Sequence, residues 1–135
     1  MDERTDVLDD GVQWRAWLLE HSLADADPTE TRAVRDGLRR AVLGEAADAP
    51  PVLVRIELGA GVPRLVAPEV TGAVLAAAAR LSTLGEWERM KICPADECRW
   101  AFFDRSRNRS RTWCSMRVCG NREKARAWRE RARTS

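Results

Sequence analysis

The sequence predicts an α+β fold that is mostly helical, with a helical N-terminal domain containing a β-hairpin and a smaller C-terminal module. The first observation is an uneven distribution of charge. Residues 1–90 contain 10 Lys+Arg and 16 Asp+Glu, whereas residues 91–135 contain 13 Lys+Arg and 5 Asp+Glu. The net charges are therefore −6 and +8. The second is that all four cysteines of the 135-residue chain lie in the basic part. We therefore divide the chain into residues 1–88 and 89–135.

Two amphipathic helices are expected in the first 45 residues. Residues 12–23 place four side chains at helical spacing: Trp14, Trp17, Leu18 and His21. A second helix starts where Asp27 can act as the N-cap and Pro28 takes the first helical position. It carries apolar residues on one face and ends near Gly44.

A β-hairpin and a third helix follow a linker with two prolines. Residues 52–58 are rich in β-branched side chains, and residues 62–66 form a second short run after a glycine-containing turn. The third helix opens at Pro68 and Glu69. We expect its core-facing side to consist of Val70, Val74, Leu75, Ala78 and Leu81.

The cysteines have the spacing of a tetrahedral zinc site. They form two C-x4-C pairs, Cys93 with Cys98 and Cys114 with Cys119, separated by fifteen residues. Each pair can supply two sulfur ligands from one tight turn, and the two pairs together complete a four-thiolate shell for one structural zinc ion. A module of this size has little apolar mass, so it needs such a cross-link to fold. Disulfides and free buried cysteines are the alternatives, and disulfides are disfavoured because the chain shows no export signal.

The same residue inventory argues against an enzyme. Four thiolates close the zinc shell and leave no position for substrate or water. The chain has one histidine, His21, so a histidine-based triad or a multi-histidine metal centre cannot be assembled. No apolar run is long enough to span a membrane. We therefore expect a cytoplasmic, non-catalytic protein.

The C-terminal sequence carries a specific string of motifs. It contains the Cys93/Cys98 pair, then Phe-Phe-Asp at residues 102–104, Ser-Arg-Asn at residues 106–108, Trp-Cys-Ser-Met at residues 113–116, and Cys-Gly-Asn-Arg at residues 119–122. This string resembles the CGNR zinc-finger family, which is named for the last tetrapeptide. The preceding part of the chain looks like the ABATE domain that usually precedes this finger.

The resemblance implies a fold and a function. It implies that the four cysteines bind zinc and that the finger is the DNA-binding element of a bacterial transcription regulator. It also implies that residues 1–88 form an ABATE-like domain linked to stress responses. We expect the finger to be treble-clef-like, with a knuckle, a hairpin and then a helix.

Two basic elements could contact nucleic acid. The tail from Asn121 is expected to be a helix with one cationic row within a sector of about 60°. A separate apolar seam, Ala125, Trp128 and Ala132, is expected to dock on the zinc core. A polar loop between the cysteine pairs alternates arginine with serine and asparagine. The expected DNA-binding residues of the two elements are Arg105, Arg107, Arg109, Arg111, Arg122, Lys124, Arg126, Arg129 and Arg133.

Several alternatives stay open at this point. The basic row could be only a solvated face, and some arginines could brace carboxylates such as Asp104 or Glu97. Arg122 could stabilise the zinc turn rather than contact DNA. The finger could bind RNA or protein, or act as a thiol-based redox sensor that ejects zinc on oxidation. With DNA as the expected partner, the protein would associate with the nucleoid. A homodimer through the N-terminal domain is a further hypothesis, and the sequence identifies no small-molecule ligand.

Overall fold

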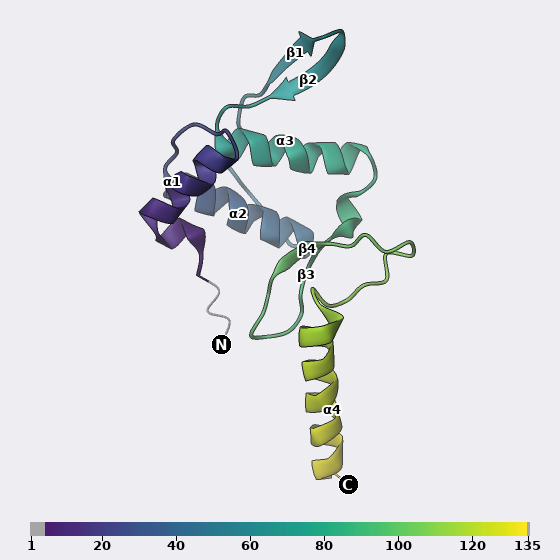
Figure 1. The fold of residues 1–135 in the computed structure, drawn as a ribbon. Helices are drawn as coiled ribbons and strands as arrows, with labels where there is room; N and C mark the ends of the chain where they lie inside the picture. The colour runs from purple at the N-terminus through teal and green to yellow at the C-terminus, as the bar shows by residue number, and fades with distance from the viewer. Residues whose placement is uncertain (1–4, 135) are drawn as a thin grey trace.

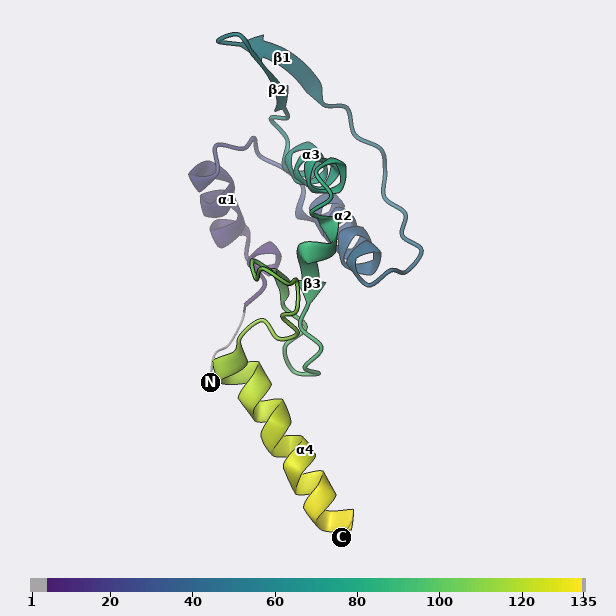
Figure 2. The same cartoon turned by 90° about the vertical axis from the view of Figure 1, so that its right-hand side faces the viewer.

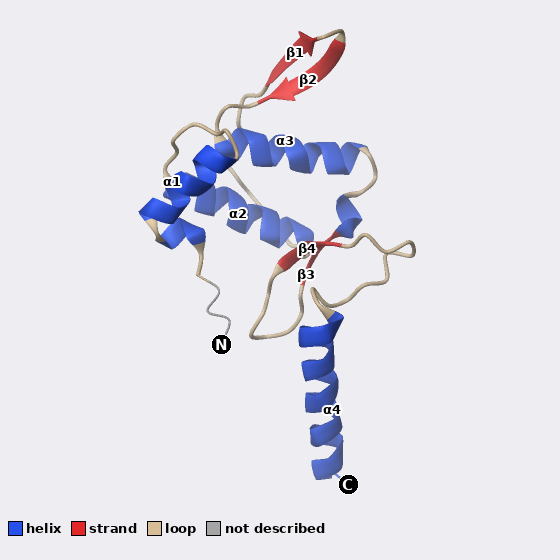
Figure 3. Cartoon of the chain, viewed as in Figure 1, coloured by secondary structure: helices blue, strands red, loops and turns tan. Residues whose placement is uncertain are grey.

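The structure is a computed structural model that describes residues 5–134 (Figure 1). Its α-helices are α1 (Gly11–Glu20), α2 (Pro28–Val42), α3 (Val70–Thr83) and α4 (Asn121–Thr134). Its strands are β1 (Arg55–Gly59), β2 (Val62–Val66), β3 (Met90–Ile92) and β4 (Ala101–Phe103). Short helical turns lie at Val7–Asp9, Trp87–Arg89 and Met116–Gly120, labelled η1, η2 and η3. Figure 3 shows that helix predominates, which confirms the predicted α+β, mostly helical class.

The first two helices begin at aspartate caps. The Asp10 carboxylate accepts hydrogen bonds from the backbone N–H groups of Val12 and Gln13 at 2.9 and 3.2 Å. Asp27 caps α2 in the same way, and Pro28 takes the first helical position as predicted. The first helix ends at Glu20 rather than at residue 23, because the chain turns at Ser22, whose φ is 55°.

The N-terminal core is small and joins three segments. Its buried side chains are Leu8, Trp14, Leu18 and Val70, which come from η1, α1 and α3. The indole N–H of Trp14 donates to the backbone oxygen of Ala26 at 2.9 Å, so the buried ring keeps a polar partner. The predicted core face of α3 is wrong at Val74, which is 38% exposed. The β1–β2 hairpin projects away from the body beyond α3 (Figures 1 and 2).

Two separate antiparallel hairpins make up the β structure. In the first, β1 pairs with β2 so that Arg55 lies opposite Val66 and Gly59 opposite Val62. In the second, β3 pairs with β4. Strand β3 also contacts α2, and this contact connects the finger to the N-terminal body. Of the helices in residues 5–134, none is long and apolar enough to cross a membrane.

Candidate metal centre

The first cysteine pair lies in the turn of the β3–β4 hairpin. Cys93 follows β3 directly, and its backbone N–H donates to the oxygen of Trp100 at 2.8 Å. The N–H of Cys98 donates to the oxygen of Ala95 at 2.9 Å, which closes a tight knuckle between the two sulfurs. The finger was predicted to contain a knuckle, then a hairpin, then a helix. In the structure the knuckle is not a separate element but the turn of the β3–β4 hairpin.

The second pair lies at the start of α4. Cys114 precedes the π-helical turn η3 and Cys119 lies within it. The Ser115 hydroxyl accepts from the N–H of Val118 at 3.2 Å and so caps this turn. A Cβ at Gly120 would collide with the Met116 sulfur, so a larger residue there would require the Met116 side chain to move.

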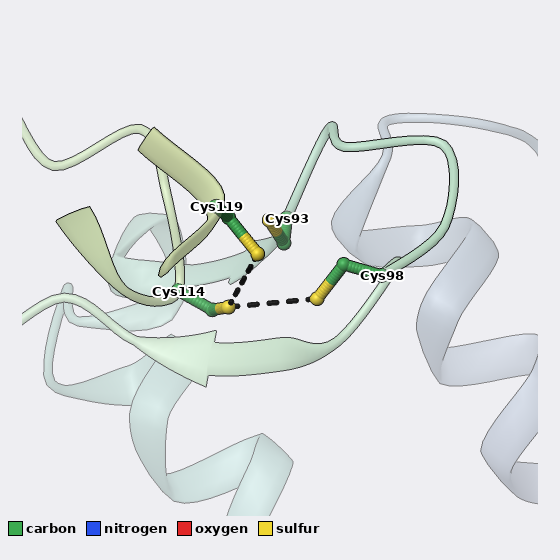
Figure 4. A group of neighbouring side chains, drawn as sticks. All are labelled: Cys93, Cys98, Cys114 and Cys119. Atoms are coloured by element: carbon green, nitrogen blue, oxygen red, sulfur yellow. Dashed lines mark hydrogen bonds between the residues drawn. The ribbon is translucent and has the colours of Figure 1, made fainter. Parts of the chain in front are cut away.

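The four sulfurs converge on one point (Figure 4). All four Sγ atoms lie within 4.8 Å of one another. The Sγ of Cys114 is 3.5 Å from that of Cys98 and 3.7 Å from that of Cys119. Zinc–sulfur bonds of about 2.3 Å in a tetrahedron place the sulfurs about 3.8 Å apart, so the observed separations fit a single ion. None of the four is in a disulfide. The cluster is a site for one structural zinc ion, as predicted.

Without a metal, this site disfavours the deprotonated form of its cysteines. Burial and hydrogen bonds from the neighbouring cysteines raise the pKa of Cys114 to about 12, and burial also raises the pKa of Cys119. Zinc supplies the positive charge that stabilises the thiolates, so the metal must displace protons when it binds. The Arg122 side chain adds to this field, because its Nη2 donates to Cys119 Sγ at 3.6 Å.

A buried ion pair holds the loop between the two cysteine pairs. The Asp104 side chain has no exposed surface, and it accepts from Lys91 Nζ at 2.8 Å and from two backbone N–H groups, those of Ser106 and Arg111. Lys91 Nζ also donates to the oxygens of Arg109 and Arg111, both at 2.7 Å. The hydrogen bond from Lys91 is the main reason that the pKa of Asp104 lies well below its usual range. This network fixes the loop on β3.

The structure divides the predicted arginines of this loop into two groups. Arg109 pairs with Glu88 at 3.4 Å, and Arg111 donates to the backbone oxygen of Trp113 at 3.0 Å. The Arg111 guanidinium also lies over the Phe102 ring, 5.2 Å from its centroid. Arg111 therefore stabilises the finger and Arg109 connects it to the preceding segment, whereas Arg105 and Arg107 form no ion pair within residues 5–134.

The predicted basic residues of α4 also fall into a group with partners in the finger and a group without an ion pair. Arg122 pairs with Glu97 at 3.1 Å, and Arg126 approaches Asp96 at 3.6 Å, so both attach α4 to the knuckle. The predicted bracing of Glu97 by an arginine is confirmed, whereas the side-chain partner of Asp104 is Lys91. Three other basic residues of α4 are exposed and form no ion pair within the described chain: Lys124, Arg129 and Arg133.

The predicted apolar seam of α4 does not dock on the zinc core. Trp128 is 65% exposed, and no residue of α4 between 121 and 134 is buried. The reason is direction: α4 leaves the site at Cys119 and points away from the body, so only its first turns reach the finger (Figures 1 and 2). Arg117, an exposed cation between the second pair of cysteines, was not among the predicted DNA-binding residues.

Comparison with known proteins identifies the finger. Residues 89–132 match a family model described as CGNR zinc finger, and this range contains all four cysteines. The search of curated proteins found no match. The predicted resemblance is confirmed for the finger, while the ABATE-like character of the N-terminal part stays a prediction.

Proposed function

We propose that this protein binds duplex DNA through α4 and the neighbouring loop and regulates transcription in this way. The observation that carries the proposal is that α4 stands free of the body, with no buried side chain (Figure 2). Its 14 residues extend about 21 Å, and a single uncovered helix has the width that the major groove admits.

The distribution of charge on α4 suits a polyanion. Arg129 and Arg133 continue the row that begins with the two knuckle-bound arginines, but they lie beyond the reach of the knuckle carboxylates. Lys124 lies on the opposite side of the helix, about 180° from this row. A helix with cations on two sides can contact the phosphates of both strands while it lies in the groove.

The zinc site fixes the position of the N-terminal end of α4. Cys119, one residue before the motif glycine, would ligate the metal, and Arg122 and Arg126 pair with carboxylates of the knuckle that carries the first cysteine pair. The metal and these ion pairs set the direction in which α4 leaves the body. Prior orientation of the helix reduces the ordering cost of binding.

A salt titration of DNA affinity tests the proposal. Of the predicted DNA-binding residues, five are exposed and form no ion pair in residues 5–134, namely Arg105, Arg107, Lys124, Arg129 and Arg133. If all five contact phosphates, the logarithm of affinity falls with the logarithm of salt concentration with a slope of about −4 to −5. The double variant Arg129→Ala/Arg133→Ala should make the slope less steep by about 2.

The matched control is Arg15→Ala, which removes an exposed arginine from α1 and should leave both slope and affinity unchanged. Single-stranded RNA is the competing ligand in the same titration. RNA binding that equals or exceeds duplex binding would contradict the proposal, and so would a double variant with unaltered DNA affinity.

A further inference from the structure

The β1–β2 hairpin carries an exposed apolar face. Ile56 lies opposite Leu65 and Leu58 opposite Pro63, and because these pairs are two residues apart, the four side chains share one face. Ile56 and Leu58 are each 74% exposed, and Leu65 is 50% exposed. The hairpin projects beyond α3 at the end of the molecule opposite α4 (Figure 1). An isolated two-stranded hairpin is marginally stable in water, so this element lacks the support that further strands would give.

The turn determines which backbone groups point outward. Ala60 and Gly61 form a two-residue turn with φ values of 49° and 81°, and the flanking residues Gly59 and Val62 are paired in register. The turn hydrogen bond makes that flanking pair a hydrogen-bonded one. Hydrogen-bonded and non-hydrogen-bonded pairs alternate along an antiparallel ladder, so the pairs of Ile56 and Leu58 are of the second kind. Their N–H and C=O groups therefore point away from β2.

The two outer edges of the hairpin are not equivalent. Pro63 has no N–H, so the outward edge of β2 lacks a donor in its middle. The outward edge of β1 keeps both donors and both acceptors of Ile56 and Leu58. In the part of the chain that the structure describes, this sheet consists of β1 and β2 alone, so the β1 edge has no strand beside it. A complete, exposed strand edge is a template for pairing with another strand.

We propose that two copies of this chain associate through β1, edge to edge and antiparallel, to form a four-stranded sheet. A two-fold axis through the Ile56 pair places Arg55 of each copy opposite Glu57 of the other. The same register places Val54 opposite Leu58, so the apolar face continues across the contact. The alternative register, centred on Glu57, would set two carboxylates side by side and is disfavoured.

The charges therefore select both the partner and the register. Arg55 and Glu57 point to the face opposite the apolar one, and their side chains already lie 3.4 Å apart within one chain. Across the axis they form non-hydrogen-bonded pairs, the type in which side chains approach most closely. The same patch serves both subunits, as a closed two-fold dimer requires. The contact is small, so we expect a Kd of about 1 µM.

Sedimentation of the full-length, zinc-loaded chain over a range of concentrations tests this inference. The wild type should dimerise, and Glu57→Lys should weaken the dimer about tenfold, because two cross-axis attractions become repulsions. Arg55→Glu should do the same. The double variant Arg55→Glu/Glu57→Lys restores opposite charges across the axis and should recover the wild-type Kd. A monomeric wild type at about 100 µM would overturn the proposal.

Two proline variants distinguish dimerisation through the β1 edge from association through the apolar face. Ile56→Pro removes an outward N–H from β1, and Leu65→Pro removes the corresponding group from the edge of β2 that Pro63 already interrupts. Both variants delete one side chain of the same cross-strand pair, and both should retain zinc. We expect Ile56→Pro to be monomeric and Leu65→Pro to dimerise. Equal effects of the two prolines would overturn the proposal, as would a wild-type dimer that neither proline nor charge reversal alters.

Discussion

The Arg122 guanidinium lies 3.6 Å from the sulfur of Cys119. The same side chain reaches Glu97 at 3.1 Å, so it joins a ligand of the second cysteine pair to the knuckle of the first. The arginine of the Cys-Gly-Asn-Arg motif thus stabilises the zinc turn. Both contacts lie within the finger.

Removing this arginine should weaken zinc binding. Arg122→Ala deletes the hydrogen bond to the ligand sulfur, and loss of such outer-shell partners lowers metal affinity about tenfold to a hundredfold. Competition with a chromophoric chelator measures the change. Arg126→Ala is the matched control, since this arginine also reaches a knuckle carboxylate one turn later but no sulfur. Equal losses in the two variants would contradict a specific role for Arg122.

Chelation should unfold the finger and spare the N-terminal core. Zinc–thiolate binding contributes about 10 kcal/mol or more to folding of small modules, whereas Leu8, Trp14, Leu18 and Val70 form a separate core. Two indole N–H signals in an NMR spectrum report the difference. The signal of Trp14, bonded to Ala26, should persist, and that of Trp113, packed against the cysteines, should shift to an unfolded position. Simultaneous loss of both would refute the division into residues 1–88 and 89–135.

Zinc affinity should rise with pH. Burial raises the pKa of Cys114 from an ordinary value of 9.0 to about 12, so the metal-free fold keeps its protons and zinc must displace them. Well below the thiol pKa values, the apparent binding constant should increase by up to about four decades per pH unit, one for each cysteine.

Competition with a chromophoric chelator at a series of pH values measures this dependence. A zinc affinity that does not change with pH would contradict this account.

Two adjacent leucines of α1 should differ in their contribution to stability. Leu18 is 2% exposed in the N-terminal core, and its neighbour Leu19 is 78% exposed. Leu18→Ala should lower the free energy of unfolding by about 2–5 kcal/mol, because it leaves a cavity. Leu19→Ala should change it by less than about 0.5 kcal/mol. Urea denaturation measures both, and similar effects would mean that α1 does not pack as described.

Local patterns in the sequence predicted the elements and the metal ligands well. The Asp27-Pro28 start, the Gly61 turn and the two cysteine pairs each depend on neighbouring residues, and each has a strong chemical preference. The outcome at Trp128 differs, because its burial depends on the direction in which α4 leaves Cys119. Periodicity identifies an apolar seam but not whether any surface faces it.

The arginines illustrate the same limit. Arg105 and Arg107 look like Arg109 and Arg111 in the alternating loop, and only the fold brings acidic and aromatic partners to the latter two. The Lys91–Asp104 pair connects residues thirteen positions apart, a distance at which sequence patterns carry no signal about contact. The two strands of the β1–β2 hairpin were predicted from the sequence, but the projection of this hairpin away from the body was not.

The coordination of the metal in the purified protein is the most direct test of the central claim. X-ray absorption at the zinc edge, combined with elemental analysis, gives the number of ions and the identity of their ligands. We predict one zinc per chain, bound by four sulfurs at about 2.3 Å. A chain that contains no metal and has its cysteines in disulfides, or a zinc with nitrogen or oxygen ligands in place of sulfur, would contradict it.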